Sequence, residues 1–197
     1  MVKYHNIEEL LEANSGIIKV SMVRESGIDK TIFYNYIKQQ ELTKIGPGIY
    51  ACPSVWEDDL YTLHLRFSQL IYSHETALYL HDLTDREPFQ PVITVKTGYN
   101  PSVLRAEGVK VHTIKASLYD VGMSMVKSNF NRWIPVYDME RTVCDIVRNR
   151  NNMDIEVFQN ALKRYVKKQN KNLHKLNEYA EQFRVNKILK HYLEVLL

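Results

Sequence analysis

The sequence lacks most of the features that would place it outside the cell or in a membrane. Two cysteines, Cys52 and Cys144, are too few for a disulfide framework or a structural zinc site. No apolar run approaches the roughly 18–20 residues that a membrane span requires. Acidic residues occupy the N-terminal stretch where a signal peptide has its apolar region. We therefore expect a cytoplasmic protein that is not exported, makes no membrane contact and holds no metal.

Short patterns typical of catalytic centres are also missing. The sequence contains no HExxH, no GxSxG and no phosphate-binding loop, and it lacks the glycine-serine pair followed by spaced aspartates of a nucleotidyltransferase. His74 and His81 lie seven residues apart, which is about 10 Å of helical rise and too far for both to bind one ion. The sequence predicts no catalytic residue, no enzymatic activity and no cofactor.

The charge is mild overall but unevenly distributed. The 197 residues carry a net charge of +3, and the hydrophobic share of 45% is typical of a folded globular protein. Residues 1–52 are neutral, residues 53–145 have a net charge of −3, and residues 146–197 have a net charge of +6. A basic C-terminal third attracts polyanions, although a solvated helical face is the commoner explanation.

The composition changes along the chain predict two domains in an α+β fold, residues 1–52 and 53–197. The first has the order helix, helix, helix, β-hairpin, which is typical of a winged helix-turn-helix. A β-prone link, Ile17-Ile18, joins its first two helices. We expect these elements to be a helix begun by the cap Asn6 and ended at Ser15-Gly16, helices at Val20–Glu25 and Asp29–Gln40, and strands at Leu42–Ile45 and Ile49–Ala51.

The third helix carries a polar stripe that is suited to DNA. Its amides suit adenine edges, its lysines suit phosphate or guanine, and a lysine of the hairpin lies where a wing meets the phosphate backbone. Since many such modules no longer bind DNA, the alternative is a scaffold for protein interaction. The predicted DNA contacts are Lys30, Thr31, Tyr34, Asn35, Lys38, Gln39 and Lys44.

The second domain reads as a mixed sheet at about residues 91–137, followed by helices over residues 138–197. Before this sheet, the same domain has a predicted helix from about residue 56 to 69. Apolar alternation predicts strands, and apolar spacing at three and four residues predicts helices. The expected strands are Val92–Lys96, Val109–Ile114 and Trp133–Tyr137, and the expected helices are Met139–Arg148, Ile155–Lys167, Leu173–Phe183 and Val185–Leu196.

A dense group of charged residues begins the first of these helices, in YDMERTVCDIV. Asp138 stands at a cap position, and Arg141 and Asp145 have the i,i+4 spacing of an ion pair. With Glu140, these residues also have the composition of a catalytic cluster. We favour the structural interpretation because a cap and an ion pair account for them.

With these residues in view, the chain resembles the AbiEi family of antitoxins from type IV, abortive-infection toxin–antitoxin systems of phage defence. IGPGIYACP is similar to the family's wing pattern through Gly46, Gly48 and Tyr50. IYSHETALYLHDLTDREP is similar to a first signature, with Asp82 where glycine is common, and PVYDMERTVCDIV to a second.

The resemblance implies a transcriptional autorepressor of a bicistronic operon. The N-terminal domain would bind inverted repeats in double-stranded DNA of its own promoter, and the C-terminal domain would counter a nucleotidyltransferase-like toxin, with which it need not form a stable complex. A monomer in solution with two copies on DNA fits this scheme. The signature residues would hold the second domain together; they are Ser73, His74, Asp138, Glu140, Arg141, Thr142 and Asp145.

Two questions stay open at the level of sequence. The chain is either this repressor or a non-DNA-binding antitoxin that neutralises the toxin by direct contact. The basic C-terminal residues either touch flanking DNA or form a solvated face. These possible accessory contacts are Lys163, Arg164, Lys167, Lys168 and Lys171.

Overall fold

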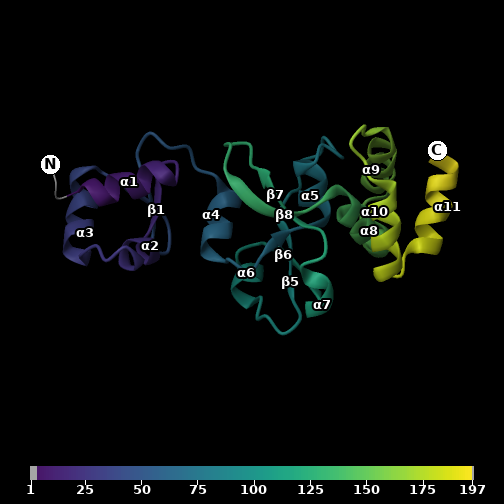
Figure 1. Ribbon diagram of the computed structural model, residues 1–197, viewed down its shortest axis with the longest axis horizontal. Coiled ribbons are helices and arrows are strands. Elements are labelled where there is room, and N and C mark those ends of the chain that lie inside the picture. Colours follow the sequence, from purple (N-terminus) through teal and green to yellow (C-terminus); the bar gives the residue numbers. More distant parts are fainter. Residues whose placement is uncertain (1–3, 197) are drawn as a thin grey trace. The chain divides into compact units, whose positions relative to one another are not determined.

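The computed structural model describes the fold of residues 4–196 (Figure 1) and their side chains up to residue 194. The chain forms two compact units. The N-terminal unit runs to Ser68 and also takes in Ser128–Arg132, whereas the sequence placed the boundary at residue 52. The C-terminal unit contains the remaining residues. The fold is α+β, as expected.

The described part of the N-terminal unit contains four helices and a three-stranded antiparallel sheet with the order β1-β3-β2. Its first strand is the β-prone link of the sequence, which pairs through Ile17 with Ala51. The first helix begins at His5, not after a cap at Asn6, and the preceding Tyr4 packs its ring 5.1 Å from that of Tyr36. The elements are α1 His5–Ala13, β1 Ile17–Lys19, α2 Val20–Glu25, α3 Lys30–Gln39, β2 Thr43–Gly46, β3 Ile49–Ala51 and α4 Asp59–Arg66.

A segment from much later in the sequence completes the N-terminal unit. Asp58, which caps α4 by accepting from the backbone N–H of Tyr61, is almost fully buried. Its other oxygen accepts a 2.6 Å hydrogen bond from the Ser128 hydroxyl and lies 3.5 Å from the guanidinium of Arg132. Arg132 also donates to the carbonyl of Trp56. Charged groups buried in this way need partners, so these contacts tie residues 128–132 to α4.

The C-terminal unit has a five-stranded mixed sheet with the order β6-β5-β4-β8-β7. The pairs β5–β6 and β4–β8 are parallel, whereas β4–β5 and β7–β8 are antiparallel. The elements are β4 Ile71–Tyr72, α5 His74–Leu80, β5 Val92–Lys96, α6 Ser102–Ala106, β6 Lys110–Ile114, α7 Ala116–Tyr119, β7 Met123–Lys127, β8 Trp133–Tyr137, α8 Met139–Asn149, α9 Ile155–Lys167, α10 Leu173–Gln182 and α11 Asn186–Leu196, with a 3-10 turn at Arg150–Asn152.

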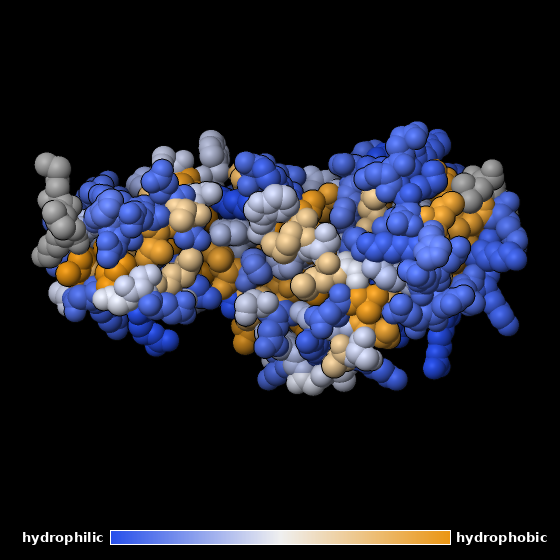
Figure 2. All heavy atoms as spheres, viewed as in Figure 1, coloured by the Kyte–Doolittle hydropathy of each residue, from blue (hydrophilic) through white to orange (hydrophobic). Residues whose placement is uncertain are grey.

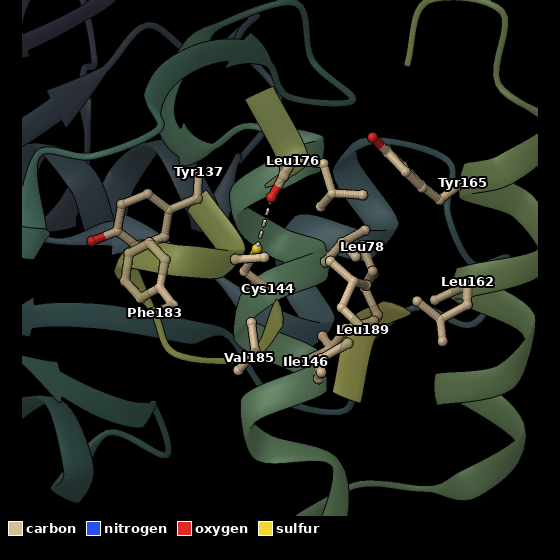
Figure 3. Packing of buried hydrophobic residues seen from close by; sticks show 14 of the residues in the cluster. Leu78, Tyr137, Cys144, Ile146, Leu162, Tyr165, Leu176, Phe183, Val185 and Leu189 are labelled. Atoms are coloured by element: carbon tan, nitrogen blue, oxygen red, sulfur yellow. Dashed lines mark hydrogen bonds between the residues drawn. The ribbon is translucent and has the colours of Figure 1, made fainter. Parts of the chain in front are cut away.

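Helix α8 is the centre of this unit and contacts α5, α9, α10 and α11. Eight of its eleven residues are buried, including Cys144 and Ile146. Figure 3 shows these two side chains among Leu78, Leu176 and Leu189 from three other helices. A helix that is buried nearly all round depends on its neighbours for stability, so the four helices and α8 form one core.

The sequence predictions hold well for this unit. The three expected strands and the four expected helices lie within a few residues of their predicted ends. The predicted helix from about 56 to 69 is shorter, at Asp59–Arg66. The strands β4 and β7 were not predicted. Within residues 4–196, no helix has the length and apolar character needed to cross a membrane.

One prediction concerns Gly122, which precedes β7. Its φ is +76°, and a Cβ at this position would lie 2.5 Å from the Cβ of Arg141. Gly108 has a similar φ of +80° with nothing within 4 Å of such a Cβ. We expect Gly122→Ala to lower the free energy of unfolding by about 1–3 kcal/mol more than Gly108→Ala does, because only the former overpacks the core. Urea denaturation of both variants measures this difference, and equal losses would contradict it.

Candidate nucleic-acid interface

Helix α3 has one buried face and one exposed polar face. Phe33, Tyr36 and Ile37 are buried in the core of the N-terminal unit, and Ile28 and Ile32 are partly buried against it. Every residue of the predicted polar stripe is exposed, and so is Lys44 on β2. The helical spacing of apolar residues therefore positioned the stripe as the sequence indicated. The exposed residues are Lys30, Thr31, Tyr34, Asn35, Lys38 and Gln39.

The side chain of Asp29 caps the N-terminus of α3. The Asp29 carboxylate accepts hydrogen bonds of 2.8 Å from the backbone N–H of Thr31 and 3.2 Å from that of Ile32. Such a cap satisfies two of the N–H groups that would otherwise be offered to an anion. An approaching phosphate would therefore have to be bound by side chains, and it would meet the negative charge of Asp29.

Aromatic side chains connect α3 to the β2–β3 hairpin. The ring of Phe33 lies 5.9 Å from that of Tyr50 on β3 and 5.7 Å from that of Tyr34. Burial raises the pKa of Tyr50, and the adjacent Tyr34 hydroxyl raises it further. Because Lys44 is the cross-strand partner of Tyr50, both side chains lie on the same face of the hairpin. Lys44 therefore stands on the same face of the hairpin as Tyr50, and its side chain is exposed.

The hairpin turn is tight. Gly48 has φ +68°, and with Pro47 before it the turn has the residues favoured by type II geometry. The pairing of β2 with β3 shifts between Lys44 and Gly46, which leaves one extra residue in β2. Lys44 is the one basic residue in the hairpin of residues 43–51. Any contact between a positive charge of this hairpin and a phosphate therefore depends on Lys44.

The basic residues of the C-terminal unit are partly engaged in ion pairs. Arg164 pairs with Asp85, Lys168 lies 3.7 Å from Asp82, and the ammonium group of Lys171 donates to the carbonyl of Lys168. Lys163 and Lys167 are exposed. On the face drawn in Figure 2, hydrophilic residues cover most of the surface over α9, α10 and α11. These contacts favour the solvated face over accessory DNA binding.

The charged group at the start of α8 is structural in its contacts. Asp138 caps the helix by accepting from the backbone N–H of Arg141, and its second oxygen lies 2.8 Å from the ammonium of Lys175. Arg141 is fully buried and donates through Nε to Asp145 at 3.0 Å. The predicted cap and ion pair are both confirmed.

Arg141 also reaches beyond its own helix. Its Nη1 donates to the carbonyls of Leu118 and Val121, and its guanidinium carbon lies 3.9 Å from the ring centre of Tyr137 and 4.0 Å from that of Phe183. Figure 3 labels both rings. Stacking of a cation on aromatic faces is favourable in a desolvated site. One guanidinium therefore joins α8, the segment before β7 and the end of α10.

Glu140 connects two other helices in the same way. Its Oε1 accepts from the Tyr165 hydroxyl on α9 and from the backbone N–H of Asn172, the cap of α10. Thr142 donates to the carbonyl of Tyr137. Both oxygens of Asp138 and one oxygen of Glu140 are thus engaged in contacts within the C-terminal unit. These contacts support the interpretation that the residues hold the unit together.

The first signature is organised around two histidines. His74 begins α5 with φ +47°, and its ring stacks on that of His112 at 3.7 Å. Ser73 precedes this helix, but its side chain makes no cap hydrogen bond and instead contacts His74 Nδ1 and accepts from Thr94. His81 contacts the carbonyl of Tyr137 at 2.7 Å. No set of three potential metal ligands occurs among residues 4–196.

Comparison with known proteins gives the fold but no family. No family model and no curated protein matches the sequence. Among solved structures, the chain is similar to the RV2827C protein from Mycobacterium tuberculosis, with a TM-score of 0.56 and 14% sequence identity. The match covers 92% of this chain and 72% of that one. At this identity the likeness establishes a shared overall fold.

The free energy of unfolding should depend on pH through the buried carboxylate of Asp145. Burial raises the pKa of Asp145 to about 6, although Arg141 beside it acts in the opposite direction. A folded-state pKa above the unfolded value of about 3.9 means that stability is lost as the pH rises from about 4 through about 6. Relative to Asp145→Asn, the native chain should lose about 3 kcal/mol of unfolding free energy between pH 4 and pH 7. Parallel profiles for the two chains would contradict this.

Proposed function

We propose that this protein is a transcriptional autorepressor and antitoxin, whose N-terminal unit is a winged helix-turn-helix that binds operator DNA. The observation that carries the proposal is the exposed polar face of α3. Helix α2 precedes α3 in the chain, and the hairpin that carries Lys44 contacts the buried face of α3 through Tyr50 and Phe33. A protein with this function works in the cytoplasm, next to the chromosome.

The dimensions of α3 suit the major groove. A helix of ten residues is about 15 Å long, and a major groove about 12 Å wide admits one helix. Four residues separate α2 from α3, which is typical of the turn between a bracing helix and a recognition helix. Asn35 and Gln39 would bind adenine edges, whereas Lys30 and Lys38 would bind phosphate or guanine.

The charge of this unit limits the affinity of one copy. Residues 1–52 have no net charge, and Asp29 places a carboxylate at the end of α3. Strong DNA-binding domains usually carry a basic face. Two copies on an inverted repeat would compensate, with half-sites about 10 base pairs or a multiple of that apart.

The antitoxin role rests on the resemblance to AbiEi proteins, with the C-terminal unit countering a nucleotidyltransferase-like toxin. The signature residues support a structural role, since Glu140, Arg141, Thr142 and Asp145 are buried in hydrogen-bonded contacts. Such residues keep a domain folded rather than turn over a substrate, which is consistent with a protein that is not an enzyme.

A second candidate is an antitoxin that binds its toxin directly. The observation in its favour is the exposure of Met123, Met125 and Trp133 on the paired strands β7 and β8. Because β7 is an edge strand, its backbone is also open to pairing with another chain. Stable co-purification with the toxin, together with no preference for operator DNA, would favour this candidate over the repressor.

The DNA-binding proposal predicts the salt dependence of two lysine variants. Fluorescence anisotropy would follow the full chain binding a duplex from the region upstream of its own gene. Since each phosphate contact releases about one counterion, Lys38→Ala and Lys44→Ala should each reduce the slope of log affinity against log salt by about one. Lys190→Ala, on the exposed face of α11, is the matched control with an unchanged slope.

Three outcomes of this titration have distinct meanings. If neither lysine variant alters affinity or slope, α3 and its hairpin are not the interface. A reduced slope for Lys167→Ala would show that the basic helices add contacts to flanking DNA. Equal affinity for the upstream duplex and a scrambled one would refute the repressor.

A further prediction concerns the cap of α3. Asparagine caps a helix about as well as aspartate does but carries no charge. We expect Asp29→Asn to fold normally and to bind the upstream duplex about two- to fivefold more tightly at low salt, because a carboxylate facing phosphate is removed. Asp29→Ala, which removes both cap and charge, controls for loss of the helix end. Weaker binding by Asp29→Asn would place the N-terminus of α3 away from the DNA.

A further inference from the structure

The C-terminal unit contains a polar pocket that neither DNA binding nor core packing explains. Its volume is about 200 Å³. At about 30 Å³ per water molecule in the liquid, this volume equals that of six or seven waters and is ample for a small polar ligand. The side chains that matter here are those of His74, His112, Arg141, Asp145, Arg148 and Asn149.

Three polar atoms of this lining are buried without a hydrogen-bond partner among the described residues. They are Nη2 of Arg141, Nδ2 of Asn149 and Nε2 of His112. Folded proteins leave few buried polar groups unsatisfied. When three of them line the same pocket, an oxyanion bound there would supply the missing partners in place of water.

The donor of Arg141 is held in a fixed position. Asp145 binds its Nε, two backbone carbonyls bind its Nη1, and aromatic rings cover the guanidinium. The side chain is fully buried, and only the Nη2 group is left to bind a ligand. A donor that is already positioned costs little ordering when it binds.

The charges of the pocket favour an anion. Asp145 offsets Arg141, and Arg148 adds a further positive charge from its exposed position. Burial lowers the pKa of His74 and of His112, so both rings are neutral near pH 7. The pocket therefore has a net charge of about +1, and two of its lining residues, Arg141 and Asn149, carry N–H groups without a partner among the described residues.

We propose that this pocket binds a small oxyanion, of which a phosphate group is the best match. Oxygen acceptors of the anion would accept from Arg141 Nη2 and Asn149 Nδ2, and the Nε2–H tautomer of His112 would supply a third donor. The site lies within the C-terminal unit and is independent of the DNA interface. Loss of DNA binding would therefore leave it intact.

The test is isothermal titration of the full chain with inorganic phosphate, with chloride at matched ionic strength as the reference. We expect saturable binding of phosphate, and of sulfate as its isostere. Glycerol 3-phosphate distinguishes the source of the group: tighter binding than inorganic phosphate indicates a phosphomonoester, and weaker binding indicates the free ion. Absence of saturable binding up to about 10 mM phosphate would overturn the proposal.

The decisive variant is Asn149→Asp. It keeps the shape of the side chain and the oxygen that accepts from Asn152, but replaces the amide donor with a negatively charged acceptor. Because hydrogen bonds to charged groups are strong, we expect phosphate affinity to fall by about tenfold or more. Asn177→Asp on the exposed face of α10 is the control for charge alone. Equal affinity of both variants would show an adventitious ion only.

A second variant guards against misfolding of the first. The carboxylate introduced by Asn149→Asp would stand at the C-terminal end of α8, where a negative charge is unfavourable. Arg148→Ala changes an exposed residue and should leave the fold intact while it weakens phosphate binding several-fold. Native affinity in both Arg148→Ala and a folded Asn149→Asp would refute the site.

Discussion

The buried guanidinium of Arg141 is the constraint on which the C-terminal unit depends. It is paired with Asp145, bonded to the backbone of the segment before β7 and covered by the rings of Tyr137 and Phe183. A buried ion pair of this kind adds little net stability, because desolvation offsets the attraction. Its contribution is positional: elements distant in sequence are held in one arrangement, since no other arrangement gives the charge its partners.

Within the N-terminal unit, helices α1 to α3 have the opposite character. Their core is made by apolar side chains such as Ile7, Val23 and Phe33, and the charges of α3 lie on the surface. The polar residues of α3 are therefore free to vary without loss of the fold. The buried polar residues around Arg141 do not have this freedom.

The elements with strong local signals were predictable from the sequence. Apolar spacing gave α8 to α11 and the exposed stripe of α3, and the spacing of Arg141 and Asp145 gave their ion pair. Long-range contacts were not predictable. β4 has only two residues, β7 is an exposed edge strand, and the stacking of His74 on His112 joins segments that share no local pattern. The backbone conformation at Asp82 was partly predictable. Its φ of +55° is one that glycine adopts readily, and glycine is common at this position in the family that the chain resembles.

The return of Ser128–Arg132 to the N-terminal unit bears on how the chain folds during synthesis. Asp58 obtains its buried partners only after residue 132 has been made, which is 64 residues beyond the end of the first segment at Ser68. At about 5–20 residues per second, a ribosome needs roughly 3–13 s to add them. During that interval the nascent chain carries α4 without the Ser128 and Arg132 partners of its capping carboxylate. The N-terminal unit is therefore complete only after the first segment of the C-terminal unit, Gln69–Lys127, has been made.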